Sequence, residues 1–183
     1  MKIMRDGITL REIEPGDTEQ IVKWRNKDWV RSNFVFQSPF TRESHENWYR
    51  NKILTGLVKQ FIILVKTSDY EEVFPVGSVY LRDIDEHHHR AEFGIFIGEE
   101  TALKSGIGTK AAKLITQYGF NELGLHKIYL RVFEDNARAI KCYEKAGFKQ
   151  EARFQDDVLI QGKYRSMIIM AMIDPKNSKK DCE

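Results

Sequence analysis

The chain has 183 residues, of which 42% are hydrophobic and 11% aromatic, a composition that can build one globular domain with an apolar core. Its 29 lysines and arginines nearly balance 27 aspartates and glutamates, and the net charge of +2 excludes the strongly basic character of most nucleic-acid-binding domains. No stretch approaches the ~20 apolar residues of a membrane span, and the first residues lack the apolar run of a secretory signal. Cys142 in a helical pattern and Cys182 in a polar tail favour reduced thiols. We therefore expect a cytoplasmic protein that acts on neither nucleic acid nor membrane.

The first third of the chain predicts one strand followed by two helices. Apolar and polar residues alternate over residues 8–13, which is typical of a strand. Asp17 follows a Pro-Gly turn and is the expected N-cap of the first helix, while Thr41 is the expected N-cap of the second, which ends before Gly56. The aromatic-rich segment 33–40 between the helices predicts a loop.

The rest of the chain alternates between strand and helix patterns. Gly94 lies inside one strand pattern, which marks it as a bulge or a point of close backbone approach. A Gln161-Gly162 turn joins the last two strands, and residues 174–183 are a polar tail. Strands are predicted over residues 61–65, 76–81, 92–97, 126–133, 154–160 and 164–173, and helices over 106–120 and 135–146.

The first chemical signal is the glycine-containing start of the third predicted helix, Gly106-Ile107-Gly108-Thr109. A helix N-terminus has unpaired N–H groups and the positive end of the helix dipole, and glycines let a phosphate approach the backbone. The geometry therefore suits a pyrophosphate. The same residues are equally compatible with a tight turn that only starts a core helix.

Three segments, taken in order, resemble the GNAT acetyltransferase superfamily. They are AEFGIFIG at 91–98, GIGTKA at 106–111 and NARAIKCYEKAGF at 136–148. The last is the most specific, because an Asn followed by Ala at +3, Tyr at +7 and Gly-Phe at +11 resembles the family's C-terminal cofactor element. Further matches at Trp24-Arg25-Asn26, Val30-Arg31 and 162–165 resemble the branch of ribosomal-protein, polyamine and nucleotide amino-sugar N-acetyltransferases.

The resemblance implies an α/β (α+β) GNAT fold for a single domain over residues 1–173, with the tail at 174–183. It implies a mixed central sheet of about seven strands and four flanking helices. Strands 4 and 5 would be splayed apart, with acetyl-CoA in the cleft between them. The backbone edge of the fourth strand would pair with the peptide-like pantetheine arm, as in strand addition.

The resemblance also implies the cofactor contacts. Backbone amides of the loop before the third helix would hold the pyrophosphate, although Leu103 and Lys104 stand where the family usually has Arg, Gln or Trp and then Gly. Asn136 would bond to the pantetheine, to its own helix as a cap, or to both. The predicted cofactor-binding residues are Phe96, Ile97, Leu103, Lys104, Ser105, Gly106, Ile107, Gly108, Thr109, Asn136 and Tyr143.

Acetyl transfer from a thioester to an amine needs a neutral amine, a donor for the oxyanion and a proton for the leaving thiolate. With the family motif, Tyr143 is the expected general acid, while helical spacing alone would make it a core aromatic. Glu92 is either the base, acting through water, or a strand carboxylate paired to Arg90 or Arg131. The backbone N–H near Phe96 is the oxyanion donor that the resemblance implies.

The acceptor is less well defined by the sequence. Arg25, Arg31, Phe36 and Trp48 are predicted substrate-binding residues that lean toward a nucleotide-linked amino sugar, with helix packing and surface charge as the other interpretation. A polyamine or a ribosomal-protein N-terminus is the alternative acceptor. A non-catalytic acyl-CoA sensor is the alternative of another class, and a homodimer is one open arrangement.

Two groups of histidines are assigned no catalytic role. The adjacent residues His87-His88-His89 cannot all turn toward one ion, so no metal site is predicted. His45 on the second helix is interpreted as a structural residue in preference to an acceptor-site residue.

Overall fold

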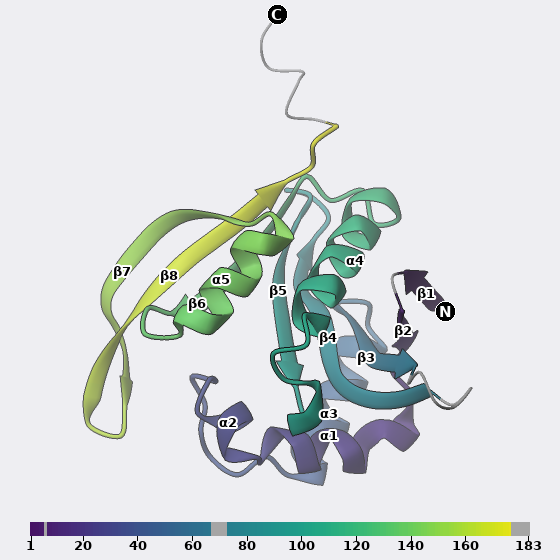
Figure 1. The fold of residues 1–183 in the computed structure, drawn as a ribbon, viewed down its shortest axis with the longest axis horizontal. Coiled ribbons are helices and arrows are strands. Elements are labelled where there is room, and N and C mark those ends of the chain that lie inside the picture. The colour runs from purple at the N-terminus through teal and green to yellow at the C-terminus, as the bar shows by residue number, and fades with distance from the viewer. Residues whose placement is uncertain (6, 67–72, 177–183) are drawn as a thin grey trace, which may run out of the picture.

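In the computed structural model, which describes residues 1–5, 7–66 and 73–176, the chain forms a mixed sheet in the order β1-β2-β3-β4-β5-β6-β8-β7 (Figure 1). Neighbouring strands are antiparallel except for β5 and β6, which are parallel. Most of the predicted tail, with Cys182, lies outside the described residues. The strands are β1 Lys2–Arg5, β2 Ile8–Glu12, β3 Val58–Lys66, β4 Val73–Asp85, β5 Arg90–Ile97, β6 Lys127–Phe133, β7 Lys149–Ile160 and β8 Lys163–Ile173.

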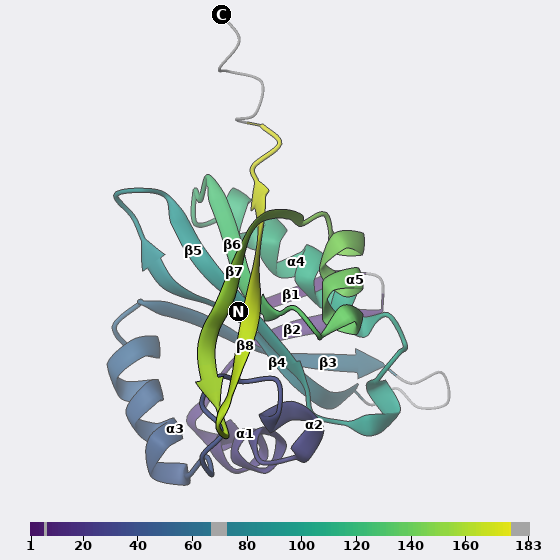
Figure 2. The same ribbon diagram turned by 90° about the vertical axis from the view of Figure 1, so that its left-hand side faces the viewer.

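Helices cover both faces of this sheet (Figures 1 and 2). The longest, α4 (Ile107–Asn121), lies with α5 (Ala137–Ala146) on one face, and α1 (Thr18–Arg25) lies with α3 (Arg42–Trp48) on the other. None of the helices in the described part of the chain is long and apolar enough to span a membrane. Shorter turns are the 3-10 segments Pro15–Asp17 and Glu100–Ala102, the single turn α2 Asp28–Arg31 and the π-turn Tyr49–Ile53.

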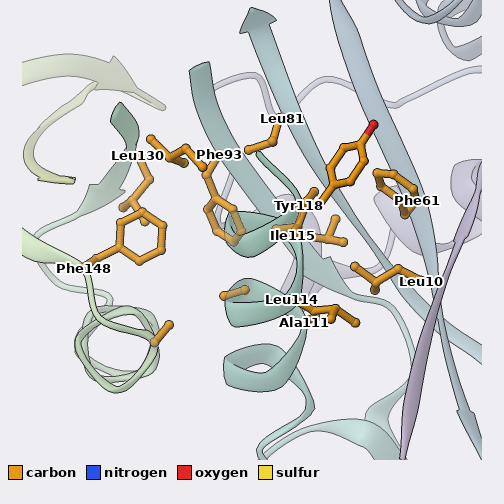
Figure 3. Close-up of a cluster of buried hydrophobic side chains, with 14 of the residues drawn as sticks. Leu10, Phe61, Leu81, Phe93, Ala111, Leu114, Ile115, Tyr118, Leu130 and Phe148 are labelled. Carbon is orange, nitrogen blue, oxygen red and sulfur yellow. The ribbon is translucent and has the colours of Figure 1, made fainter. Parts of the chain in front are cut away.

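The sheet separates two hydrophobic cores. Successive side chains of a strand point to opposite faces, and in β3 Phe61 and Ile63 enter the larger core under α4 while Ile62 and Leu64 enter the smaller core under α1 and α3. Figure 3 shows the larger core, where the apolar face of α4 packs on the sheet. In this close-up, Ala111, Leu114, Ile115 and Tyr118 meet Leu10, Phe61, Leu81, Phe93, Leu130 and Phe148. Both cores support the centre of the sheet, where β5 lies.

The gap that matters for function opens between β5 and β6. Their parallel pairing covers only Arg90 with Lys127, Ala91 with Ile128 and Glu92 with Tyr129. Beyond Glu92, β5 stays paired to β4 as far as Ile97, but no pairing of that part with β6 occurs among the described residues. The fourth and fifth predicted strands, at 92–97 and 126–133, correspond to β5 and β6. The predicted splay between them is therefore present.

The structure adds two elements to the prediction. The strand β1 pairs with β2 across a turn at Gly7, whose φ is +80°, and it raises the sheet from about seven strands to eight. Its sequence has no clear alternation because it is a short, mostly exposed edge strand. The single turn α2 adds a fifth α-helix to the predicted four, within a segment too short for helical periodicity to be read.

The two predicted helix caps have different outcomes. Thr41 is the N-cap of α3, and its hydroxyl accepts a hydrogen bond from the Ser44 N–H at 3.1 Å. Asp17 is the N-cap residue of α1, as predicted, but its side chain makes no capping hydrogen bond to that helix. It ends a 3-10 turn, where its carboxylate pairs with Arg11 at 2.7 Å and accepts from the Glu14 N–H at 2.8 Å.

Asp174, which the sequence assigns to the tail, is part of the folded domain. It is buried, and its N–H donates to the His126 carbonyl at 2.9 Å.

Candidate functional site

A cleft of about 2020 Å³ runs through the splay and is lined from both sides of the sheet. Its walls include side chains of β4, β5 and β6, one side of α4 along its length, most of α5, and residues of the segment from Trp29 to Trp48. Ligand pockets for one small molecule reach about 1000 Å³. The cleft therefore has room for a large cofactor and a second substrate together.

The loop that leads into α4 has the backbone expected of an anion site. Gly106 is the N-cap of α4 with a φ of +81°, a conformation that favours glycine, and the first N–H groups of a 15-residue helix follow it. Lys104 has a φ of +63°, so the position where the family usually has glycine is also left-handed here. A phosphate placed here would meet unpaired N–H groups and the positive end of the helix dipole.

The charge of this end of the cleft matches the same ligand. Its lining carries a set of basic side chains on the loop, α4 and α5. A polyanionic cofactor would be attracted to such a surface. These side chains are Lys104, Lys110, Lys113, Arg138, Lys141 and Lys145.

The predicted cofactor residues gather at this end of the cleft. Phe96, Ile97, Leu103, Lys104, Gly106, Gly108, Thr109, Asn136 and Tyr143 line it. Ser105 and Ile107 do not, since the Ser105 hydroxyl donates to the Ala102 carbonyl at 2.6 Å and Ile107 packs against the larger core. The backbone amides of both residues belong to the same loop and helix start, so their predicted role through the main chain stays a prediction.

Asn136 is the N-cap of α5. Its Oδ1 accepts from the Ala139 N–H at 3.1 Å, and its Nδ2 donates to Asn33 Oδ1 at 2.7 Å. The capping role is therefore present, and the second bond ties α5 to the loop after α2. A bond to pantetheine stays a prediction.

Tyr143 faces the cleft from α5 while its ring packs on the larger core. The ring centroid lies 5.7 Å from that of Phe93 and 6.1 Å from that of Phe148, both edge to face. Burial raises the pKa of Tyr143 above the ordinary value of 10. The phenol is therefore protonated at neutral pH, as a proton donor must be.

Glu92 lies between two guanidinium groups. Its Oε1 accepts from Arg82 Nη2 at 2.6 Å and from Arg131 Nε at 3.3 Å, and only 9% of the side chain is exposed. The pairing with Arg131 was one of the sequence-based interpretations. Arg90, the other predicted partner, instead pairs with Asp85 at 3.4 Å. Arg82 was missed, because it faces Glu92 only through the register of β4 and β5, next to a bulge that the sequence does not reveal.

Three of the four predicted acceptor residues line the cleft, on the side of α1 and α3. The Arg25 guanidinium stacks on the ring of Phe34 at 3.2 Å, and its burial lowers its pKa. Trp48 lines the same wall, and Phe36 lines it although 85% of that residue is exposed. Arg31 is not in this wall. It pairs with Asp28 at 3.0 Å and borders a separate hollow of about 370 Å³.

The loop after α2 is fastened to the far side of the splay, a feature that the sequence did not indicate. Arg165 Nη1 donates to the Ser32 carbonyl at 3.4 Å, and Gln161 Nε2 donates to Gln37 Oε1 at 3.3 Å. Arg165 is itself held by Asp135 and by stacking on Phe133 at 3.5 Å. We call residues 32–37 the acceptor loop, because residues 33–36 line the cleft next to the predicted acceptor residues Arg25 and Trp48.

A second junction joins the two halves of the cleft at the start of the cofactor loop. Trp24 Nε1 donates to Glu99 Oε1 at 2.6 Å, and Lys27 Nζ donates to the Gly98 carbonyl at 2.7 Å. The Trp24 hydrogen bond is the main reason that the pKa of Glu99 is lowered. Gly98 is required here, since a Cβ on it would lie 2.0 Å from the Trp24 ring.

Of the histidines that the sequence singles out, His45 lines the cleft, whereas His87, His88 and His89 do not. His45 is 1% exposed, and its Nδ1 lies 3.0 Å from Thr18 Oγ1, in line with the structural interpretation. His87 and His88 contact each other, with ring centroids 4.6 Å apart. Within the described residues, no three His, Cys, Asp or Glu side chains are grouped so that they could hold a metal ion.

Comparisons with known proteins agree with this geometry. Residues 8–149 match the family model described as the acetyltransferase (GNAT) domain. A spermidine N(1)-acetyltransferase of Vibrio cholerae is 30% identical over 174 residues, which cover 94% of this chain and 96% of that protein. A spermidine N(1)-acetyltransferase of Escherichia coli is 44% identical over 96 residues, 52% of this chain, and the match spans about half of that relative, 51% of its length.

Solved structures give the same result for the fold. The crystal structure of the Vibrio cholerae spermidine N-acetyltransferase in complex with CoA and spermine matches with a TM-score of 0.83 at 27% identity. That match covers 92% of this chain and 96% of the other. With its fold, its splayed strands and the family model over most of its length, the chain belongs to the GNAT family of acetyltransferases, whose cosubstrate is acetyl-CoA.

Proposed function

We propose that the protein transfers the acetyl group of acetyl-CoA to a primary amine of a polyamine. The observation that carries the proposal is the cleft through the splay, which presents an anion site and a free strand edge on one side and a separate aromatic wall on the other. The acceptor is chosen from the relatives, because a protein 30% identical over 94% of this chain and a solved structure that covers 92% of it are spermidine acetyltransferases. A putative ribosomal N-acetyltransferase of Bacillus subtilis matches 93% of the chain at the lower identity of 23%. The polyamine replaces the nucleotide-linked amino sugar as the first acceptor to test.

One set of cleft residues would bind acetyl-CoA, and another would take part in the proton transfers. The amides of residues 103–108 would hold the pyrophosphate, and the free edge of β5 at Phe96 and Ile97 would pair with the pantetheine arm. Acetyl-CoA supplies an activated thioester. The N–H near Phe96 would then donate to the oxyanion that forms at the thioester carbonyl.

Proton transfers complete the proposed reaction. An N–C bond forms and the C–S bond breaks, and Tyr143 would give its proton to the leaving sulfur. The proton lost by the amine would pass through water to Glu92 or directly to solvent. Since Arg82 and Arg131 both engage Glu92 Oε1, that carboxylate also serves to hold the two arginines in place.

One observation favours a second candidate acceptor. The wall where the amine would enter carries Arg25, Arg82 and Arg131 together with the carboxylate of Glu92. A polycation is better matched by several carboxylates, whereas an acceptor with a phosphate is attracted to guanidinium groups. A nucleotide-linked amino sugar is therefore the second candidate.

The test is release of the CoA thiol with a panel of amines: spermidine, a UDP-linked amino sugar and a peptide that begins with Ala or Ser. We expect release with spermidine and a small residual rate without any amine. Release with the amino sugar in place of spermidine would select the second candidate. Binding of acetyl-CoA without thiol release for any amine would contradict both and indicate a sensor.

We also propose that the chain self-associates. A Vibrio cholerae spermidine N-acetyltransferase forms a dodecamer, and apolar side chains of the β7–β8 hairpin are exposed here, with Phe154 at 48%, Leu159 at 60% and Tyr164 at 66%. Light scattering after size-exclusion chromatography measures the mass directly, and a monomer at micromolar concentration would rule the proposal out.

A further inference from the structure

Tyr80 occupies a position in the cleft to which no role has been given so far. The register of β4 and β5 places Tyr80 opposite Gly94 and Arg82 opposite Glu92. Because side chains alternate along a strand, these four residues share one face of the sheet. It is the face of α1 and α3, since Tyr80 packs against the smaller core.

The side chain of Tyr80 lies directly on the backbone of β5. A Cβ at Gly94 would be 2.3 Å from Tyr80 Cε2 and Cζ and 2.5 Å from its hydroxyl oxygen, so any side chain at position 94 would force the tyrosine ring to shift. The pairing of β4 and β5 is continuous across Gly94, so the glycine marks this close approach and not a bulge. The hydroxyl therefore lies over β5 just beyond Glu92, where β5 separates from β6.

The ring is held from the other side by a fixed wall. Trp48 contacts Tyr80 edge to face, with centroids 6.3 Å apart and planes at 70°. Trp48 Nε1 donates to Gln60 Oε1 at 2.9 Å, and Gln60 Nε2 donates to Ser78 Oγ at 3.0 Å. Gln60 and Ser78 are buried, so this chain of hydrogen bonds fixes the indole and with it the tyrosine.

The chemistry of the hydroxyl suits contact with an amine. Burial raises the pKa of Tyr80, with Arg82 and Arg25 acting in the opposite direction, so the phenol is neutral at neutral pH. A neutral phenol oxygen can accept a hydrogen bond from an N–H group. The neighbouring carboxylate of Glu92 has one oxygen shared by two arginines. Tyr143 lies across β5, where it packs on Phe93.

We propose that Tyr80 binds the attacking amine: its hydroxyl oxygen accepts a hydrogen bond from the acceptor nitrogen and holds that nitrogen beside the splay, facing the thioester. Gly94 makes this possible because it leaves room for the ring. The inference rests on the proposed function, and it names the residue that receives the amine whichever amine the panel selects.

Two substitutions test the proposal from opposite directions. Tyr80→Phe removes the hydroxyl and keeps the ring on Trp48, whereas Gly94→Ala keeps the hydroxyl and displaces the ring. Tyr118→Phe is the matched control. Tyr118 lies on α4, its ring packs on Phe61, and it does not line the cleft. Kinetics are measured with spermidine, or with the panel amine that supports thiol release, and acetyl-CoA binding is measured by calorimetry.

We expect Tyr80→Phe to lower kcat/KM for the amine about 10- to 100-fold, with unchanged acetyl-CoA affinity and a melting temperature close to that of the wild type. Gly94→Ala should lose at least as much. The double variant should cost no more than the larger single variant, because both changes remove the same contact.

Three results would overturn the inference. They are a wild-type kcat/KM for Tyr80→Phe, losses that add in the double variant, and a loss of acetyl-CoA affinity equal to the loss in kcat/KM. In each of these cases the wild type still releases thiol with the amine. Failure of the proposed function looks different, since the wild type itself would then release no thiol with any amine of the panel.

Discussion

The two faces of β5 differ in how they are built. On the side of α4 and α5, the cofactor half of the cleft consists of backbone geometry: a left-handed Gly106, a helix N-terminus and a free strand edge. On the side of α1 and α3, the acceptor half consists of side chains that hold one another, such as Arg25 on Phe34 and Trp48 on Tyr80. Main-chain groups can hold the same cofactor in proteins of different sequence. In the acceptor half, by contrast, a single substitution can alter the contacts that the substrate meets.

Tyr143→Phe should have the largest effect and tests the cofactor half. Loss of a general acid lowers kcat by about 10²- to 10⁴-fold. The ring packing on Phe93 and Phe148 is retained, so acetyl-CoA affinity and stability should stay as in the wild type. Steady-state kinetics at several pH values measure the effect, and a turnover number equal to that of the wild type would remove Tyr143 from the mechanism.

Arg165→Met tests the acceptor half, with an expected effect of intermediate size. It removes the bonds from the guanidinium to Ser32 and Asp135 and keeps an unbranched side chain on Phe133. We expect KM for the amine to rise about 3- to 10-fold, equivalent to roughly one hydrogen bond, while KM for acetyl-CoA stays constant.

Arg153→Met is its matched control. Arg153 lies on the same hairpin, where it pairs with Glu134 and donates to Ser166 Oγ at 3.4 Å, so its hydrogen-bond partners differ from those of Arg165. Equal effects of the two substitutions would show that general stability of the hairpin is responsible, and not the hold on the acceptor loop.

Lys104→Gly separates backbone from side chain in the cofactor loop. Lys104 has a φ of +63°, where a non-glycine residue costs about 1 kcal/mol, so glycine should raise the melting temperature by roughly 2–4 °C. The lost charge should weaken acetyl-CoA binding at low salt. Gly106→Ala, at a φ of +81°, should change stability in the opposite direction. A lower melting temperature for Lys104→Gly would contradict the strain argument.

Glu99→Gln should have the smallest effect, on the junction between the two halves. The Trp24 N–H holds the pKa of Glu99 below its ordinary value of 4.5. A lowered pKa adds stability that is present above pH 4.5 and is lost as the pH falls through the folded-state value. Urea unfolding between pH 7 and pH 3 should therefore show a shallower acid loss of stability for the variant. An identical slope would mean that the junction contributes no measurable stability.

The contrast between the halves explains what the sequence could predict. Most strands and helices follow from periodicity, whereas the splay is what the resemblance implies, which is carried above all by the segment from Asn136 to Phe148. The edge strand β1 and the single turn α2 were missed because they are too short to show a period.

The contacts of the acceptor half could not be predicted in the same way. Arg82 meets Glu92, and Tyr80 meets Gly94, only through strand register, and register depends on a bulge that has no local sequence signal. Arg165 reaches Ser32 across 133 positions of the chain. Arg31 was placed in the acceptor site from its residue type and from the resemblance at Val30-Arg31, and it lies outside the cleft.

The free edge of β5 has a further consequence for solubility. Unpaired strand edges are where other chains add and aggregate, and proteins commonly protect the outer edges of their sheets for that reason. Here the unpaired edge lies inside the sheet, between β5 and β6, where α5 and the acceptor loop flank it. A second sheet would be blocked by these flanking elements, so the feature proposed to admit a pantetheine arm is also protected against strand addition by another chain.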